Sequence, residues 1–137
     1  MAHVIIALGS NSRQSAHIAW ASQRLYMLLD GLWLSPALWS PDIRQTGAMY
    51  LNRLATGSTM LSADELTCVL KGIETATGRN SQQVTIDLDV MLYDNLRYHE
   101  RDWSRPYIQR LLPFLRLSPL FPHLLPLASH LSPSLLP

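Results

Sequence analysis

Residues 83–93, Gln-Val-Thr-Ile-Asp-Leu-Asp-Val-Met-Leu-Tyr, alternate between polar and apolar side chains more regularly than any other stretch of the chain. A period of two predicts a β-strand with one buried face. The apolar face is expected to consist of Val84, Ile86, Leu88, Val90 and Leu92, and the opposite face of Thr85, Asp87, Asp89 and Met91. The strand therefore presents two carboxylates on the same side of a sheet.

Three further strands and a helix are expected before the second half of the chain. The strands are predicted over residues 3–8, 32–39 and 49–60. Pro36 interrupts the second of these, which predicts an edge or bulged strand, and residues 41–47 are typical of a polar loop. A stripe of apolar side chains predicts a helix from Ser15 to about Asp30, with Gly31 as its C-cap.

A second helix is predicted from Ser62, because Ser62-Ala63-Asp64-Glu65 has the spacing of a capping box and Gly78 stands where the helix should stop. Its apolar stripe is expected to consist of Leu66, Val69, Leu70 and Ile73. The predicted order is β-α-β-β-α-β, which indicates an α+β fold. This is the ferredoxin-like arrangement, a mainly antiparallel sheet with both helices packed on one face.

The length of 137 residues fits one compact domain, and its composition divides the chain unequally. Residues 94–112 predict a charged connection and a short helix from Arg105. Residues 113–137 hold six of the nine prolines and only one charged side chain, Arg116. We expect residues 1–112 to form the working domain and residues 113–137 to be a Leu- and Pro-rich tail outside it.

Eleven basic and ten acidic side chains leave a net charge of +1, which favours neither nucleic acid nor a membrane surface as a partner. Prolines interrupt the apolar runs of the tail, and the amino terminus lacks a signal-peptide pattern. The single cysteine, Cys68, allows no disulfide within the chain and is expected to be a small buried side chain. We expect a cytoplasmic monomer that acts on small molecules.

Asp87 and Asp89 are candidate ligands of a hard cation, because residues two apart on a strand project from the same face. A site with two carboxylates suits Mg²⁺, which usually retains waters and binds the phosphates of a substrate. A polyphosphate substrate is then expected. The plainer alternative is an exposed polar face of the sheet.

Four segments together resemble a known enzyme family. They are Ala7-Leu8-Gly9-Ser10-Asn11, Tyr50-Leu51-Asn52, Ile73-Glu74 with Gly78-Arg79, and Thr85-Ile86-Asp87-Leu88-Asp89-Val90-Met91-Leu92-Tyr93. In type, order and spacing they are similar to the 6-hydroxymethyl-7,8-dihydropterin pyrophosphokinases (2-amino-4-hydroxy-6-hydroxymethyldihydropteridine diphosphokinases) of folate biosynthesis. The resemblance covers residues 3–93 and fades to a weak Leu-Pro match at Leu112.

The resemblance implies a ferredoxin-like enzyme that transfers a pyrophosphoryl group from ATP, its co-substrate, to the hydroxymethyl group of a reduced pterin. It also implies two Mg²⁺ ions, held by Asp87 and Asp89. Arg79 matches a basic position that assists the transfer, and Glu74 matches a position that contacts the nucleotide. We assign Lys71 to the nucleotide site with Glu74.

The positions expected to bind the pterin are Ser40, Pro41, Tyr50 and Asn52. Of these, Asn52 matches an amide that binds the ring edge, since an amide both donates and accepts hydrogen bonds. Plainer alternatives remain for several of the matched positions. Asn52 could be only a polar residue at the end of a strand, and Tyr50 could serve only packing. Arg79 could be a charge at the C-terminus of the helix that the helix dipole favours, and Glu74 could form a salt bridge with Lys71.

Three departures indicate a divergent member with an altered catalytic loop. Gln82-Gln83-Val84 replaces the Gly-Pro-Arg that contacts ATP phosphates, the loop over residues 80–84 is short, and a Pro-His segment that contacts ATP is missing. Residues 97–107 stand in its place and are rich in arginine and aromatic residues.

One hypothesis is that Arg101 and Arg105 supply the lost phosphate contacts while Trp103 or Tyr107 stacks on a ring. The alternative is an ordinary turn in which the arginines pair with Glu100 and Asp102.

Two functional interpretations follow, and a third is weaker. The first is an active ATP- and Mg²⁺-dependent pyrophosphoryl transferase. The second is a catalytically weakened homologue that binds nucleotide or pterin in a binding or regulatory role. A ferredoxin-like RNA-binding protein would need paired aromatic residues on central strands and a basic face, and neither pattern is evident.

Overall fold

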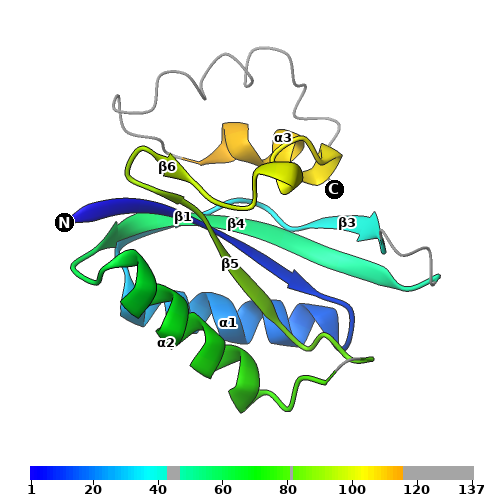
Figure 1. Cartoon of the computed structure of the whole chain (residues 1–137). Coiled ribbons are helices and arrows are strands. Elements are labelled where there is room, and N and C mark those ends of the chain that lie inside the picture. Colours follow the sequence, from blue (N-terminus) through cyan, green and yellow to red (C-terminus); the bar gives the residue numbers. More distant parts are fainter. Residues whose placement is uncertain (43–46, 81, 116–137) are drawn as a thin grey trace.

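The computed structural model describes residues 1–42, 47–80 and 82–115. The strands are β1 (Ala2–Ser10), β2 (Asp30–Leu34), β3 (Leu38–Pro41), β4 (Met49–Thr59), β5 (Asp87–Tyr93) and β6 (Leu96–Arg97). The helices are α1 (Gln14–Leu28), α2 (Ala63–Ala76) and α3 (Pro106–Leu111), with 3-10 turns η1 (Glu100–Asp102) and η2 (Leu112–Phe114). The predicted β-α-β-β-α-β order is confirmed, with a short C-terminal addition (Figure 1).

The sheet is antiparallel and runs in the order β2-β4-β1-β5-β6, with β3 also paired to β4. Helices α1 and α2 lie on one face of this sheet, and α3 with the 3-10 turns lies on the other (Figure 1). The predicted α+β, ferredoxin-like class is confirmed. Within the described residues, no helix combines the length and the apolarity needed to cross a membrane.

Strand β1 is buried on both faces, because apolar side chains occupy five consecutive positions, residues 4–8. Val4, Ile6 and Leu8 pack in the core beneath α1 and α2. Ile5 and Ala7 pack in a second core formed largely by α3 and the turns beside it. This second core includes Trp103, Ile108, Leu111, Leu112 and Leu115. The C-terminal residues up to Leu115 therefore cover the sheet face opposite the two long helices.

The strand predicted over residues 83–93 begins only at Asp87. Val84 instead pairs with Asn11, whose backbone N–H donates to Val84 O at 2.9 Å and whose Oδ1 accepts from Val84 N at 2.8 Å. The predicted alternation also breaks at Met91, because Ile6 pairs with Val90 whereas Ile5 pairs with Leu92. This bulge places Leu92 with Met91 in the second core, so the prediction that Leu92 shares a face with Val90 was wrong.

The edge prediction around Pro36 is confirmed, although the strand divides into β2 and β3 on either side of it. Gly31 is not the C-cap of α1, because that helix ends at Leu28 and Leu29 is already extended. Gly31 has φ +63° and lies at a bulge in β2, where a left-handed residue is needed. Within the predicted loop, Pro41 closes β3 and residues 43–46 lie outside the described part of the chain.

The capping box at Ser62 is confirmed. Ser62 Oγ accepts from Glu65 N at 3.1 Å, and Glu65 Oε1 accepts from Ser62 N at 2.9 Å. The predicted inward stripe is corrected at Val69, which is 39% exposed. Glu74 is buried at the end of the same helix face. Cys68 is exposed rather than buried, since it lies two residues beyond buried Leu66 and therefore faces outward.

Replacing the capping hydroxyl should weaken α2 at its first turn. We expect Ser62→Ala to lower the free energy of unfolding by about 1 kcal/mol, because Glu65 N loses its acceptor. Urea denaturation measures this change. Thr67→Ala, at an exposed position of the same helix, is the matched control and should change stability by less than about 0.5 kcal/mol. Equal losses in the two variants would contradict the role of the cap.

Candidate active site

Three neighbouring strands bring polar residues together at one end of the sheet. Gly9 of β1 pairs with Asn52 of β4 on one side and with Asp87 of β5 on the other. A Cβ at Gly9 would lie 3.6 Å from both Asn52 Oδ1 and Tyr50 Cδ1. The glycine therefore leaves open the space between these side chains, and it lines a cavity there.

Two cavities meet at Tyr50, Asp87 and Asp89, which line both of them. The first has a volume of about 210 Å³, and its wall includes Ser40, Pro41, Asn52, Asp102, Arg105 and Tyr107. The second has a volume of about 560 Å³, and its wall includes Lys71, Glu74, Thr75, Arg79, Asn80 and Val84. The two aspartates thus stand where two binding spaces join.

The residues that sequence reasoning assigned to the pterin line the first cavity. Of those assigned to the nucleotide, Lys71 and Glu74 line the second cavity, whereas Arg105 lines the first and Arg101 lines neither. Asn52 is 4% exposed, and its Nδ2 donates to Leu38 O at 3.1 Å and to Ser40 Oγ at 2.7 Å. These bonds fix the amide plane of Asn52 against β3. Because both N–H groups of Nδ2 are used in these bonds, Oδ1 is the atom left to accept a hydrogen bond from a donor on a ring edge.

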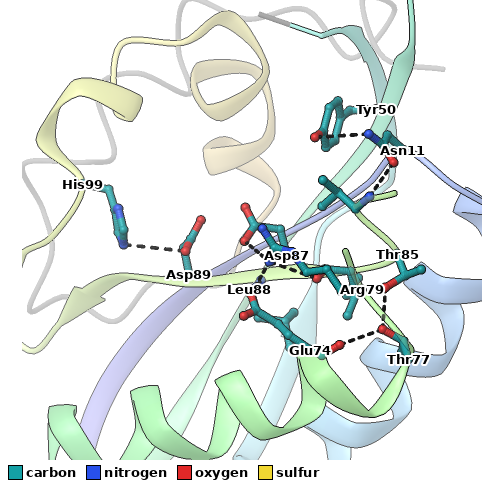
Figure 2. Close-up of polar contacts among 12 residues, drawn as sticks. Asn11, Tyr50, Glu74, Thr77, Arg79, Thr85, Asp87, Leu88, Asp89 and His99 are labelled. Atoms are coloured by element: carbon teal, nitrogen blue, oxygen red, sulfur yellow. Dashed lines mark hydrogen bonds and ion pairs between the residues drawn. The ribbon is translucent and has the colours of Figure 1, made fainter. Parts of the chain in front are cut away.

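Arg79 joins two carboxylates (Figure 2). Its Nη1 lies 3.0 Å from Glu74 Oε2 and 3.0 Å from Asp87 Oδ1, and it also donates to Ile86 O at 3.4 Å. The alternative that Glu74 pairs with Lys71 gives way to this contact with Arg79. Lys71 is exposed, and it lines the second cavity together with Arg79.

Glu74 is held by the open edge of β5. Strand β6 pairs with Leu92 and Tyr93, and within the described residues no strand pairs with the first residues of β5 on that side. Leu88 N donates to Glu74 Oε2 at 2.8 Å there. Burial raises the pKa of Glu74, while the hydrogen bond from Leu88 opposes that shift. The carboxylate of α2 therefore fixes the backbone between the two aspartates.

The two aspartates fit a hard divalent cation. Their side chains are 38% and 31% exposed for Asp87 and Asp89, so an ion from solvent can reach both. Burial, and then repulsion by Asp87, raises the pKa of Asp89 to about 7. A cation would relieve that repulsion. No group of three or more His, Cys, Asp or Glu side chains within the described residues converges as a metal site. A pair of carboxylates suits Mg²⁺, because this ion usually takes several of its ligands from water and phosphate.

His99 lies beside Asp89, with its Nε2 3.7 Å from Asp89 Oδ1 (Figure 2). The sequence analysis did not predict this position. His99 has a left-handed backbone with φ +55°, which turns the chain after β6. The short β5–β6 hairpin brings it back to the aspartate, and no local pattern in the sequence signals that return.

The arginine-rich segment divides between the surface and the first cavity. Arg105 lines that cavity, and its Nε donates to Asp102 Oδ1 at 2.7 Å, as the plainer alternative expected. Arg101 lines neither cavity. Trp103 is buried in the second core, with its Nε1 donating to Tyr98 O at 3.0 Å, whereas Tyr107 lines the cavity. Of the two aromatic candidates, Tyr107 therefore has access to a ligand.

Asn11 connects the site to the short loop that precedes β5. Besides its two bonds with Val84, its Nδ2 lies 3.5 Å from Tyr50 Oη. Sequence reasoning noted Asn11 only as part of the Gly-Ser-Asn motif. Its amide links the end of β1 to Tyr50 of β4 and to Val84 before β5. These partners lie 39 and 73 residues away in the sequence, so local patterns do not reveal the role of Asn11.

The comparison with protein families gives one match. A family model described as 7,8-dihydro-6-hydroxymethylpterin-pyrophosphokinase (HPPK) matches residues 5–123. Among the curated proteins compared, none matches the chain. The matched range includes both cavities and the whole of the sheet after Val4.

Removing the Glu74 carboxylate should destabilise the protein through the backbone of β5. We expect Glu74→Ala to lower the free energy of unfolding by about 1–3 kcal/mol, because Leu88 N–H would lose its acceptor. Glu74→Gln keeps an amide oxygen for that bond and should lose less. Urea denaturation compares the two variants. If the Ala and Gln variants lose equal stability, the bond to Leu88 is not the source of the effect.

The raised pKa of Asp89 predicts a pH dependence of stability. Because the folded-state pKa is about 7 and the ordinary value is 3.8, the folded protein binds more protons than the unfolded chain between these pH values. The free energy of unfolding contributed by this group therefore falls as pH rises from about 4 to 7. The free energy of unfolding of Asp89→Asn minus that of the wild type should therefore be larger at pH 8 than at pH 5, in buffers without divalent cations. Denaturation curves whose difference is the same at both pH values would contradict this shift.

Proposed function

The chain belongs to the 7,8-dihydro-6-hydroxymethylpterin-pyrophosphokinase family, and from this premise we propose that it transfers a pyrophosphoryl group from ATP to the hydroxymethyl group of a reduced pterin. One observation carries the proposal. The residues expected to bind pterin line the first cavity, Lys71 and Glu74 of those expected to bind nucleotide line the second, and Asp87 and Asp89 line both. A reaction between two substrates needs such a junction, because the attacking hydroxyl must meet the phosphate at one point.

In this proposal, ATP occupies the second cavity. Lys71 and Arg79 lie in its wall and supply positive charge for the phosphates. Asp87 and Asp89 hold two Mg²⁺ ions, which when bound would neutralise the phosphate oxygens and orient the phosphate chain. Glu74 acts here chiefly on Leu88 and Arg79, because it is 8% exposed and both of these contacts use its carboxylate.

The pterin occupies the first cavity. The Asn52 amide, fixed by Leu38 O and Ser40, presents its Oδ1 to accept a hydrogen bond from a donor on the edge of the ring. Tyr50 and Tyr107 provide aromatic surface on the cavity wall, with Pro41 beside them. The hydroxymethyl group then points toward the aspartates, which are the part of the wall shared with the nucleotide cavity.

We also propose that Arg105 contributes one of the phosphate contacts that the Gly-Pro-Arg motif supplies elsewhere in the family. It lines the cavity that contains Asp87 and Asp89, and Asp102 holds its guanidinium at 2.7 Å. Arg101 remains the weaker candidate for this role, since it lines neither cavity. The chain is proposed to act as a cytoplasmic monomer whose site lies within residues 1–112.

The alternative is a weakened homologue that binds nucleotide or pterin without efficient turnover. The short connection from α2 to β5 favours it, because a loop tied to Asn11 through Val84 has little length with which to close over substrates. Retention of two like charges at the cavity junction favours the enzyme. A binding protein need not keep two like charges on one strand face.

The test is an AMP-release assay with hydroxymethyldihydropterin, ATP and Mg²⁺. We expect AMP from the wild type and a loss of at least about 100-fold in Asp87→Ala, because the metal ligand is removed. Asp64→Ala, at an exposed position on α2, is the matched control and should retain activity. No AMP from concentrated wild-type protein would contradict catalysis. A rise in melting temperature with Mg²⁺ and an ATP analogue, without turnover, would then favour the weakened homologue.

A further inference from the structure

We propose that Arg79 is an internal counter-cation of Asp87 which a divalent cation replaces, and that Glu74 is the positioning residue that holds the guanidinium there. This inference rests on the proposed function, because it takes Asp87 to be a metal ligand. It adds an exchange to that site: Asp87 binds either Arg79 or the metal, and the arginine that is released becomes available to phosphates.

The geometry shows one nitrogen serving two carboxylates. Arg79 Nη1 lies 3.0 Å from Asp87 Oδ1 and 3.0 Å from Glu74 Oε2 (Figure 2). The two acceptors come from different elements, since Glu74 lies near the end of α2 and Asp87 begins β5. The guanidinium therefore occupies one of the two oxygens of the Asp87 carboxylate, and this carboxylate is the group at which a hard cation would bind.

The balance of charge explains why a cation is needed before any ligand arrives. Glu74, Asp87 and Asp89 are three carboxylates at one end of β5, and Arg79 is the cation that contacts two of them. A metal ion at Asp87 would bring positive charge next to the guanidinium and compete for the same carboxylate. Two like charges on one carboxylate repel each other, so the two cations exchange rather than share it.

The surroundings of Arg79 allow it to leave Asp87. Its side chain is 33% exposed, and it lines the second cavity near Lys71. Phosphates bound in that cavity would accept its hydrogen bonds. Glu74, in contrast, stays in place, because it is buried and accepts from Leu88 N at 2.8 Å. A fixed Glu74 returns the arginine to Asp87 once the ligands have gone.

Two consequences follow from the exchange. Without phosphates, a divalent cation must displace Arg79 and therefore binds weakly to the protein. With phosphates, Arg79 is drawn toward the second cavity and the metal binds more tightly. By thermodynamic linkage, the metal must strengthen phosphate binding by the same factor. The site thus favours a metal and a polyphosphate that arrive together.

The test measures metal binding in the absence of nucleotide, with Mn²⁺ as a paramagnetic probe. We expect Arg79→Gln to bind Mn²⁺ roughly two- to fivefold more tightly than the wild type. This fold-change corresponds to the free energy of a partly exposed ion pair. Lys71→Gln is the matched control. It removes one positive charge from the same cavity, and its constant should stay within about 1.5-fold, because Lys71 has no ion pair with Asp87 in the described part of the chain.

Equal gains in Mn²⁺ affinity in the two variants, or weaker Mn²⁺ binding by Arg79→Gln, would overturn the exchange. The proposed function would still stand if the wild type releases AMP. An absence of Mn²⁺ binding in all three proteins would overturn it together with the assignment of Asp87 and Asp89 as metal ligands.

A second measurement follows the arginine itself. When Mg²⁺ is added to the wild type, the NMR signals of the Arg79 guanidinium should shift, and the exchange of its hydrogens with water should accelerate. Arg53 is the internal control, because its Nε donates to Ser35 O at 2.7 Å. Signals of Arg79 and Arg53 that stay equally unaffected at saturating metal would contradict displacement of Arg79.

Discussion

The pairing of β1 with both β4 and β5 is the constraint on which the rest of the molecule depends. Its register sets Gly9 between Asn52 and Asp87, so that one residue without a side chain separates the two halves of the site. Because β1 is apolar on both faces, the sheet must be covered on both sides. The long helices cover one face, and residues after β6 cover the other. That second layer supplies Arg105 and Tyr107 to the first cavity.

Charge is the second organising element. Strand β5 begins with two carboxylates on an edge that β6 does not reach, and Glu74 uses the same open edge to accept from Leu88. Arg79 then balances Glu74 and Asp87. The stability of this end of the sheet and its capacity to bind a cation consequently depend on the same few side chains.

Local sequence patterns predicted the helices and strands well wherever the contacts that define them lie within one segment. The capping box at Ser62 sets the start of α2 through contacts three residues apart, which a sequence contains in full. Strand β5 was predicted from its alternation, but its first residues and its bulge at Met91 were not. Those features depend on Asn11 and on the register with β1, and both are long-range. The exposure of Val69 and Cys68 likewise reflects how α2 sits on the sheet.

By itself the sequence determined the order of elements, the two aspartates on one strand face and the resemblance that assigns the pterin and nucleotide residues. These depend on periodicity and on motifs a few residues long, which are properties of local segments. Only the tertiary structure decided that Arg105 and Tyr107 lie at the first cavity, that His99 returns to Asp89, and that Arg79 contacts Asp87. Each of these contacts requires separate segments to fold against the same end of the sheet. Periodicity within one segment carries no information about which other segment will meet it.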